Sequence, residues 1–258
     1  MPSTILQTRT PKRVTITLNR PQSRNALNRQ MLRELCDAFQ TLEADPDCSV
    51  VVLEGKAGFF CTGMDFEEFA ADPAQAAVGA AEGELDSTYM TLLKAIAASS
   101  KVVVSVVAGQ VLAGGVGLVA ASDLVIATPP STFGLPEALW GLLPACVTPF
   151  LIRRVGFHPA YKLALTTQNI TAEEACRIGL VDAVQEAPEE ILRRYLLRLS
   201  RLDTATIATL KSYFRAMWIL DDRMERAAVE EINRLSRSPR VQDNIRNYQV
   251  HRKFPWEI

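Results

Sequence analysis

The sequence is poor in histidine, and it lacks clustered cysteines, long apolar runs and an excess of charge of one sign. Its two histidines, His158 and His251, lie far apart among 258 residues, so a histidine-rich zinc site is not expected. The five cysteines are scattered, with no CxxC pair and no metal-ligand spacing. We therefore expect reduced, packed thiols, no metal and no cofactor.

The charge balance also excludes several classes of partner. Lys and Arg total 28 and Asp and Glu total 29, so the net charge of −1 gives no signal for nucleic acid or an acidic membrane surface. No apolar run reaches the roughly 20 residues of a membrane span, and the N-terminal segment MPSTILQTRTPKRV has no signal-peptide core. These absences favour a cytoplasmic protein without nucleic-acid or membrane partners.

The first two thirds of the chain alternate strand-like and helix-like segments. RVTITL (13–18) alternates like a half-buried strand, whereas 49–55, 101–109 and 123–128 are nearly continuous β-branched runs, typical of strands covered on both faces. Helical spacing separates these runs. The pattern predicts an α/β core.

From about residue 146 onward helical patterns prevail. Thr171 and Glu174 form a capping box that predicts a helix start, and two further helices are expected over 204–219 and 221–236. The stretch EEILRRYLLRLSRL (189–202) is basic and amphipathic, which fits either a solvated helix face or a surface that docks an acidic partner.

Two glycine-containing turns each precede a predicted helix. One lies in GFFCTGMDFEEF (58–69), with a helix expected near Met64 and Asp65, and the other is Gly114–Gly115 in VLAGGVGLVAASDL (111–124). Backbone N–H groups at a helix start are unpaired and carry partial positive charge. If the two turns converge, they would form an oxyanion hole made wholly of backbone.

Glu137 is the one acidic residue of the stretch STFGLPEALWGLLP (131–144) and a candidate for proton transfer. It follows Pro136 at a probable helix start, where the helix dipole alone would favour an acid. Its neighbours are largely apolar, and such surroundings raise the pKa of a carboxyl toward neutrality. Glu137 is therefore either a first-turn acid or a proton carrier.

Together these stretches resemble the enoyl-CoA hydratase/isomerase (crotonase) superfamily. The resemblance runs in order through TITLNRPQSRNALN, FCTGMDF, AGGVGLVAASDLVIA, FGLPE and AEEACRIGLVD. It implies an α/β fold of repeated ββα units (1–195) and a C-terminal helical trimerisation region (196–258). It also implies a thioester substrate whose carbonyl oxygen accepts N–H bonds from Met64 and Gly114.

One departure from the family pattern reduces the number of reactions that the resemblance allows. Hydratases of this family carry one glutamate in the helix after the glycine turn and a second in the FGxPE motif. Alignment of AGGVGLVAA places Gly117 at the first position, so only Glu137 remains. Hydration by two cooperating carboxylates is therefore in doubt, while isomerases of the family keep the single glutamate. We expect no gain of activity from Gly117→Glu, because the side chain would crowd the pocket.

Finer features resemble the dehydratases of polyketide β-branching cassettes, which act on 3-hydroxy-3-methylglutaryl (HMG) attached to an acyl-carrier protein. These are the segments LWGLLPACVTPFLIRRVG, CTGMDF, LLRLSRL and the terminal FPWE. The resemblance implies dehydration to 3-methylglutaconyl-carrier, with a phosphopantetheine-linked acyl thioester or acyl-CoA as partner. An isomerase or hydratase of fatty-acid metabolism, a methylglutaconyl decarboxylase and a non-catalytic carrier-binding scaffold remain alternatives.

Five further residues are candidates for this site. Asp65 could orient the hydroxyl at C3 as a catalytic residue, or it could be a first-turn helix acid. Tyr89 could hydrogen-bond the substrate, Lys94 could bind the distal carboxylate, and Arg24 could contact the phosphate of the thioester arm. Cys146 would flank the pocket, where packing is its simpler role.

Three arginines of the basic helical stretch are candidates for steering an acidic carrier protein toward the site. They are Arg193, Arg194 and Arg198. If they steer, added salt should slow the reaction of a carrier-bound substrate more than that of a short thioester.

Overall fold

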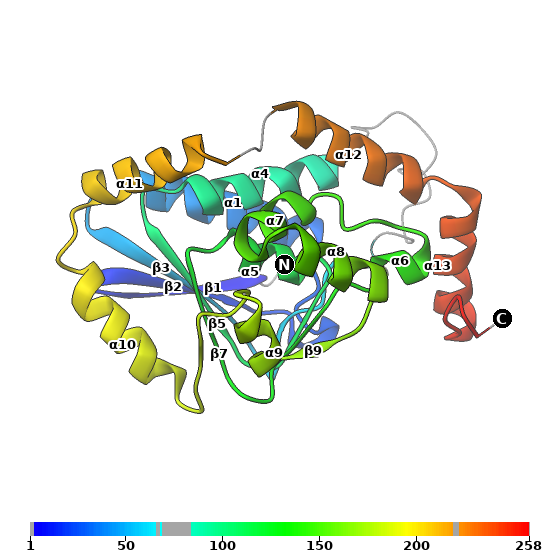
Figure 1. Cartoon of the computed structure of the whole chain (residues 1–258), viewed down its shortest axis with the longest axis horizontal. Coiled ribbons are helices and arrows are strands. Elements are labelled where there is room, and N and C mark those ends of the chain that lie inside the picture. Colours follow the sequence, from blue (N-terminus) through cyan, green and yellow to red (C-terminus); the bar gives the residue numbers. More distant parts are fainter. Residues whose placement is uncertain (1–2, 66–67, 69–83, 219–221, 258) are drawn as a thin grey trace.

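Two β-sheets and the helices around them make up the fold of this computed structural model, which describes residues 3–65, 68, 84–218 and 222–257 (Figure 1). The six-stranded sheet has the order β1 (Ile5–Thr10), β2 (Lys12–Leu18), β3 (Cys48–Gly55), β5 (Val102–Val107), β7 (Leu124–Ala127) and β10 (Ala183–Val184). The four-stranded sheet has the order β4 (Phe59–Cys61), β6 (Gln110–Leu112), β8 (Thr132–Gly134) and β9 (Ile170–Thr171).

Consecutive strands divide between the two sheets in a repeated pattern. β3, β5 and β7 pair in parallel in the six-stranded sheet, and the strand that follows each of them joins the four-stranded sheet. A helix comes after each pair, namely α4 (Glu84–Ala98), α5 (Gly114–Ala121) and α6 (Glu137–Trp140). This is the expected α/β fold of ββα units, and the prediction of the fold class is confirmed.

Helices cover both faces of the six-stranded sheet (Figure 1). Val51 and Leu53 of β3 face the core formed with α1 (Arg29–Glu43) and α4, whereas Val50 and Val52 face α10 (Pro188–Leu199). Successive side chains of a strand point to opposite faces, so a strand covered on both sides needs apolar residues throughout. This explains the unbroken valine runs.

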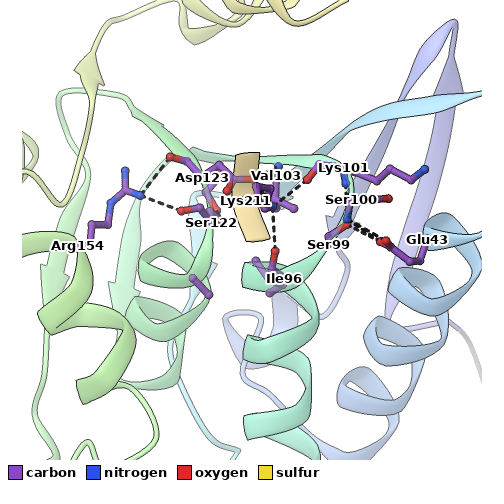
Figure 2. Close-up of polar contacts among 12 residues, drawn as sticks. Glu43, Ile96, Ser99, Ser100, Lys101, Val103, Ser122, Asp123, Arg154 and Lys211 are labelled. Atoms are coloured by element: carbon purple, nitrogen blue, oxygen red, sulfur yellow. Dashed lines mark hydrogen bonds and ion pairs between the residues drawn. The ribbon is translucent and has the colours of Figure 1, made fainter. Parts of the chain in front are cut away.

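A polar network joins the units at the amino-terminal end of β5 (Figure 2). Asp123 Oδ2 accepts the Val103 N–H at 2.8 Å and lies 2.7 Å from the Lys211 ammonium. Lys211 Nζ also donates to the carbonyls of Lys101, at 2.9 Å, and Ile96, at 3.5 Å. These bonds satisfy the start of one strand and the end of one helix at the same time.

The same arrangement recurs one unit later. Asp182 Oδ2 accepts the Val125 N–H and pairs with Arg154 Nη2, each at 2.6 Å. Arg154 also donates to the carbonyls of Ser122, at 2.9 Å, and Leu180, at 2.8 Å. In both units, then, an acidic side chain accepts the N–H of a strand residue and pairs with a cationic side chain, which in turn donates to nearby carbonyls.

The chain ends in a run of helices. They are α7 (Thr148–Val155), α8 (Phe157–Thr166), α9 (Ala172–Arg177), α10, α11 (Thr204–Ala216), α12 (Asp222–Ser236) and α13 (Pro239–His251). The Thr171–Glu174 capping box is confirmed at the start of α9. The boundary expected at 195/196 falls inside α10, and this division of the chain stays a prediction. In the described part of the chain, no helix is both long and apolar enough to cross a membrane.

Candidate active site

The two glycine-containing turns meet, as the sequence predicts. A Cβ placed on Gly63 would lie 2.6 Å from the Cβ of Ala113 and 3.3 Å from the nitrogen of Gly114. A Cβ on Gly115 would lie 2.3 Å from the carbonyl oxygen of Cys61. The 2.6 Å and 2.3 Å distances are shorter than the contacts that real Cβ atoms make. Glycine is therefore needed at positions 63 and 115 for the turns to pack against each other.

The Met64 N–H faces away from the neighbouring segment. Leu27 donates its N–H to the carbonyl of Gly63 at 2.7 Å, and its own carbonyl accepts the Asp65 N–H at 3.0 Å. Backbone groups of consecutive residues point to opposite sides of an extended strand. The Met64 N–H therefore points away from the Leu27 backbone, and both residues line one cavity.

The second backbone donor lies at the start of α5. Gly114 is the first helical residue, and N–H groups in the first turn of a helix have no partner inside it. Ala113, just before it, has φ 50°, a conformation that residues other than glycine rarely adopt. Strained backbone of this kind collects at functional sites. The geometry thus brings Met64 and Gly114 to the same cavity.

Glu137 provides the acid of this cavity. It is the first residue of α6, and its Oε2 is shielded from solvent with no hydrogen-bond partner among the described residues. Burial raises the pKa of Glu137 from 4.5 to about 7. A carboxyl with this pKa is present in both protonation states near neutral pH, so it can accept a proton and return it.

The cavity has a volume of about 410 Å³ and a largely apolar wall. Of the predicted site residues, six line it: Arg24, Met64, Tyr89, Gly114, Glu137 and Cys146. The roles assigned to them stay predictions, but the structure gathers them around one space. Its volume suits a small acyl group with part of its thioester arm.

The C-terminal part of the chain forms one wall of the cavity, which the sequence motifs do not predict. Tyr248 of α13 lines the cavity, as do Phe254 and Trp256 of the tail. The Tyr248 and Phe254 rings pack on Trp140, which follows Glu137 by three residues. The Phe254 and Trp256 rings are stacked, with centroids 4.7 Å apart. The FPWE segment carried the resemblance to a subgroup, but nothing in the sequence indicates that it folds back onto the site.

Two predicted site residues do not reach the cavity. Lys94 Nζ pairs with Glu225 Oε2 at 2.6 Å, which joins α4 to α12 on the outside of the molecule. Asp65 Oδ2 pairs with Arg20 at 2.7 Å, while its Oδ1 accepts the Glu68 N–H at 3.3 Å. We therefore correct both assignments: Lys94 is placed to join two helices, and Asp65 to hold the turn beside Met64.

Most of the helix expected from Met64 and Asp65 lies outside the described residues. Within 66–83 only Glu68 is described, and it is helical. The three arginines proposed for steering belong to α10, which packs on the opposite face of the sheet and supplies no residue to the described cavity wall.

Arg24 and the cysteines complete the description of the site. Arg24 is the one cationic residue among the described residues lining the cavity, and its guanidinium lies 5.7 Å from the centre of the Phe59 ring. None of the five cysteines, all of which lie in the described part of the chain, forms a disulfide. Burial raises the pKa of Cys61 to about 12, so this thiol stays neutral and packs against the turn. In the described part of the chain, no three His, Cys, Asp or Glu side chains cluster as metal ligands do.

Comparison with known proteins identifies the family of the chain. The chain matches the enoyl-CoA hydratase/isomerase family over residues 12–258. It is 35% identical over 242 residues to the bacillaene synthase dehydratase PksH of Bacillus subtilis, covering 94% of this chain and 92% of that protein. It is also 35% identical over 199 residues to the 2,3-dehydroadipyl-CoA hydratase of Escherichia coli, covering 77% of this chain and 74% of the relative.

Solved structures give the same picture. The PksH structure from Bacillus subtilis, described as a polyketide biosynthesis enoyl-CoA hydratase, superposes with a TM-score of 0.90 at 34% identity, covering 98% of this chain and 99% of that one. AtuE from Pseudomonas aeruginosa superposes with a TM-score of 0.80 at 32% identity, covering 99% of this chain and 100% of that one.

Proposed function

This chain belongs to the enoyl-CoA hydratase/isomerase family, and on that premise we propose that it dehydrates 3-hydroxy-3-methylglutaryl-acyl-carrier protein to the 3-methylglutaconyl form. The observation that carries the proposal is the Glu137 carboxyl, whose Oε2 has no hydrogen-bond partner among the described residues, in a cavity that Met64 and Gly114 also line. Similarity to a dehydratase of a polyketide synthase supports the direction of the reaction and the kind of substrate.

The proposed chemistry has two steps. The Glu137 carboxylate takes a proton from C2 of the thioester, and the N–H groups of Met64 and Gly114 stabilise the enolate oxygen. The C3–O bond then breaks, and Glu137 returns the same proton to the departing hydroxide, which leaves as water. One carboxyl suffices because the first step leaves it in the protonation state that the second step needs. Each backbone donor of such a hole contributes about 3 kcal/mol.

The substrate itself favours the use of one acid. The carbon that carries the hydroxyl of HMG is tertiary, so its methyl group stabilises the C2=C3 double bond that forms as the C–O bond breaks. A straight-chain 3-hydroxyacyl thioester forms a less substituted double bond and depends more on a second acid. Arg24 lines the cavity and carries a guanidinium, which supports our proposal that it contacts the phosphate of the thioester arm.

We further propose that the active form is a homo-oligomer, a trimer by family resemblance. Phe157, Tyr161 and Leu165 lie one turn apart on α8 and are 67%, 53% and 64% exposed. Exposed apolar rows of this kind support an association surface. Light scattering on the purified chain would test it, and a monomer at micromolar concentration would contradict it.

Mass spectrometry of the carrier-bound acyl group tests the proposed activity. HMG-carrier and HMG-CoA are incubated separately with the protein, and we expect loss of one water from the carrier form, with slower loss from the CoA form. An unchanged mass in both would contradict dehydration and leave a carrier-binding scaffold, detected by co-elution with the carrier.

The same assay separates the rival activities. Loss of carbon dioxide from 3-methylglutaconyl-carrier, without any reaction of HMG-carrier, would indicate a decarboxylase. Movement of the double bond in a 3-enoyl thioester, followed by ultraviolet absorbance of the conjugated product, would indicate an isomerase. Rapid hydration of crotonyl-CoA would indicate an ordinary hydratase.

A further inference from the structure

The space above Gly117 is filled by an atom from another helix. A Cβ placed on Gly117 would lie 2.0 Å from the hydroxyl oxygen of Tyr89, 3.2 Å from Tyr89 Cζ and 3.2 Å from Val147 Cγ2. Real Cβ atoms do not approach another heavy atom to 2.0 Å. The Tyr89 hydroxyl in its present position and a side chain at position 117 therefore compete for the same space, and one of them must move to admit the other.

The same hydroxyl holds the start of α5. Tyr89 is only 8% exposed, and its hydroxyl lies 2.6 Å from the carbonyl oxygen of Gly114. A carbonyl only accepts, so the phenol must donate its single hydrogen there. This hydrogen is then not available to a substrate oxygen, so the predicted hydrogen bond between Tyr89 and the substrate would have the phenol oxygen as its acceptor.

We propose that Tyr89 is a positioning and specificity-determining residue that takes the place of a side chain at position 117. It fixes Gly114, whose N–H belongs to the oxyanion hole, and it keeps a second acid and its water out of the cavity. The enzyme is thereby limited to the one-carboxylate route and to thioesters branched at C3. The limitation to branched substrates rests on the proposed function.

Thermal unfolding of single and double variants at positions 89 and 117, without any substrate, tests whether the Tyr89 hydroxyl occupies the space above Gly117. Gly117→Ala alone should lower Tm by about 5 °C, because its methyl group collides with the Tyr89 hydroxyl. In a Tyr89→Phe background the same change should lower Tm by less than half as much, since the 2.0 Å collision is gone, only the two 3.2 Å contacts remain and alanine favours a helix. Equal losses of Tm in both backgrounds would overturn the proposal.

A gain of activity tests the specificity. Tyr89→Ala combined with Gly117→Glu should hydrate crotonyl-CoA at least tenfold faster than the parent or either single variant. Adding Glu137→Gln should abolish that gain. No gain in the well-folded double variant would overturn the specificity claim. Neither experiment uses HMG, so failure to dehydrate HMG-carrier would count against the proposed function and leave these two results readable.

Discussion

Two partly buried carboxylates have opposite surroundings in this molecule. Asp123, at the start of β7, bonds the Val103 N–H and the ammonium of Lys211, which in turn donates to two helix and strand carbonyls (Figure 2). Glu137, in the cavity at the other end of the strands, has an Oε2 without a partner among the described residues. A shielded acid normally has its charge compensated. The saturated site holds the fold, whereas the unsaturated site has a carboxyl free to exchange a proton.

The largest expected effect comes from removing the charge at the unsaturated site. Glu137→Gln keeps the shape of the side chain but cannot accept the C2 proton, so kcat for dehydration of HMG-carrier should fall about 10³-fold. The product mass, followed against time, measures it. Circular dichroism should show an unchanged fold, and native-like turnover by the variant would show that Glu137 is not the base.

The second effect, on the order of 3 kcal/mol, concerns stability and pH. The pKa of Glu137 is 4.5 in an unfolded chain and about 7 in the folded protein, so the folded state binds the proton more tightly. Between these pH values the unfolded chain ionises first, and the wild type loses stability as pH rises through about 7. Glutamine does not titrate. Urea unfolding should therefore show that the free energy of unfolding of Glu137→Gln increases relative to that of the wild type between pH 4.5 and pH 8.

Activity should follow the opposite course through the same pKa. Since the base must be ionised, kcat/KM of the wild type should rise about tenfold per pH unit below about 7 and then level off. A stability difference that stays constant over this pH range would mean that the Glu137 carboxyl is solvated in the folded protein.

The third effect breaks the saturated site. Lys211→Met should lower the free energy of unfolding by about 2 kcal/mol, because it leaves Asp123 without its cation and two carbonyls without a donor. The matched control is Lys94→Met. It breaks an equally short ion pair with Glu225, but the Lys94 side chain is 46% exposed against 11% for Lys211.

An exposed pair contributes little, so the control should cost less than about 0.5 kcal/mol. Urea midpoints of the two variants give the comparison directly. Equal losses in both variants would mean that burial does not distinguish the two lysines.

The long strands and the helix starts were predictable because each is recorded in a contiguous stretch of sequence. The valine runs at 49–55 and 101–109 correspond to β3 and β5, and the capping box marks α9. The strands of the second sheet, such as β4 and β6, have three residues each. Three residues are too few for a period to be recognised, and these strands exist only through pairing with segments some fifty residues away.

The site residues, like the strands, were predictable from the sequence only where a short contiguous motif determines their position. Met64, Gly114 and Glu137 lie in short motifs whose backbone geometry is local, so the sequence placed all three at one cavity. The prediction that Lys94 binds the substrate was wrong because the direction of a helical side chain depends on its neighbours. Here Lys94 forms an ion pair with Glu225 of the neighbouring helix. The glycine at position 117 was visible in the sequence, but the tyrosine that fills its space comes from another helix.

The smallest effect separates support of the site from chemistry within it. Arg20 donates to the Ala26 carbonyl at 2.6 Å and to Asp65 at 2.7 Å, so the pair joins the 20–27 loop to the turn that presents Met64. Asp65→Asn keeps an oxygen for the Glu68 N–H but removes the charge that holds Arg20. We expect kcat/KM to fall about fivefold, through a displaced donor, with an unchanged pH profile. A catalytic Asp65 would instead lose 10²-fold or more and shift the profile, so the pH dependence of the variant decides whether this carboxylate belongs with Glu137 or with Asp123.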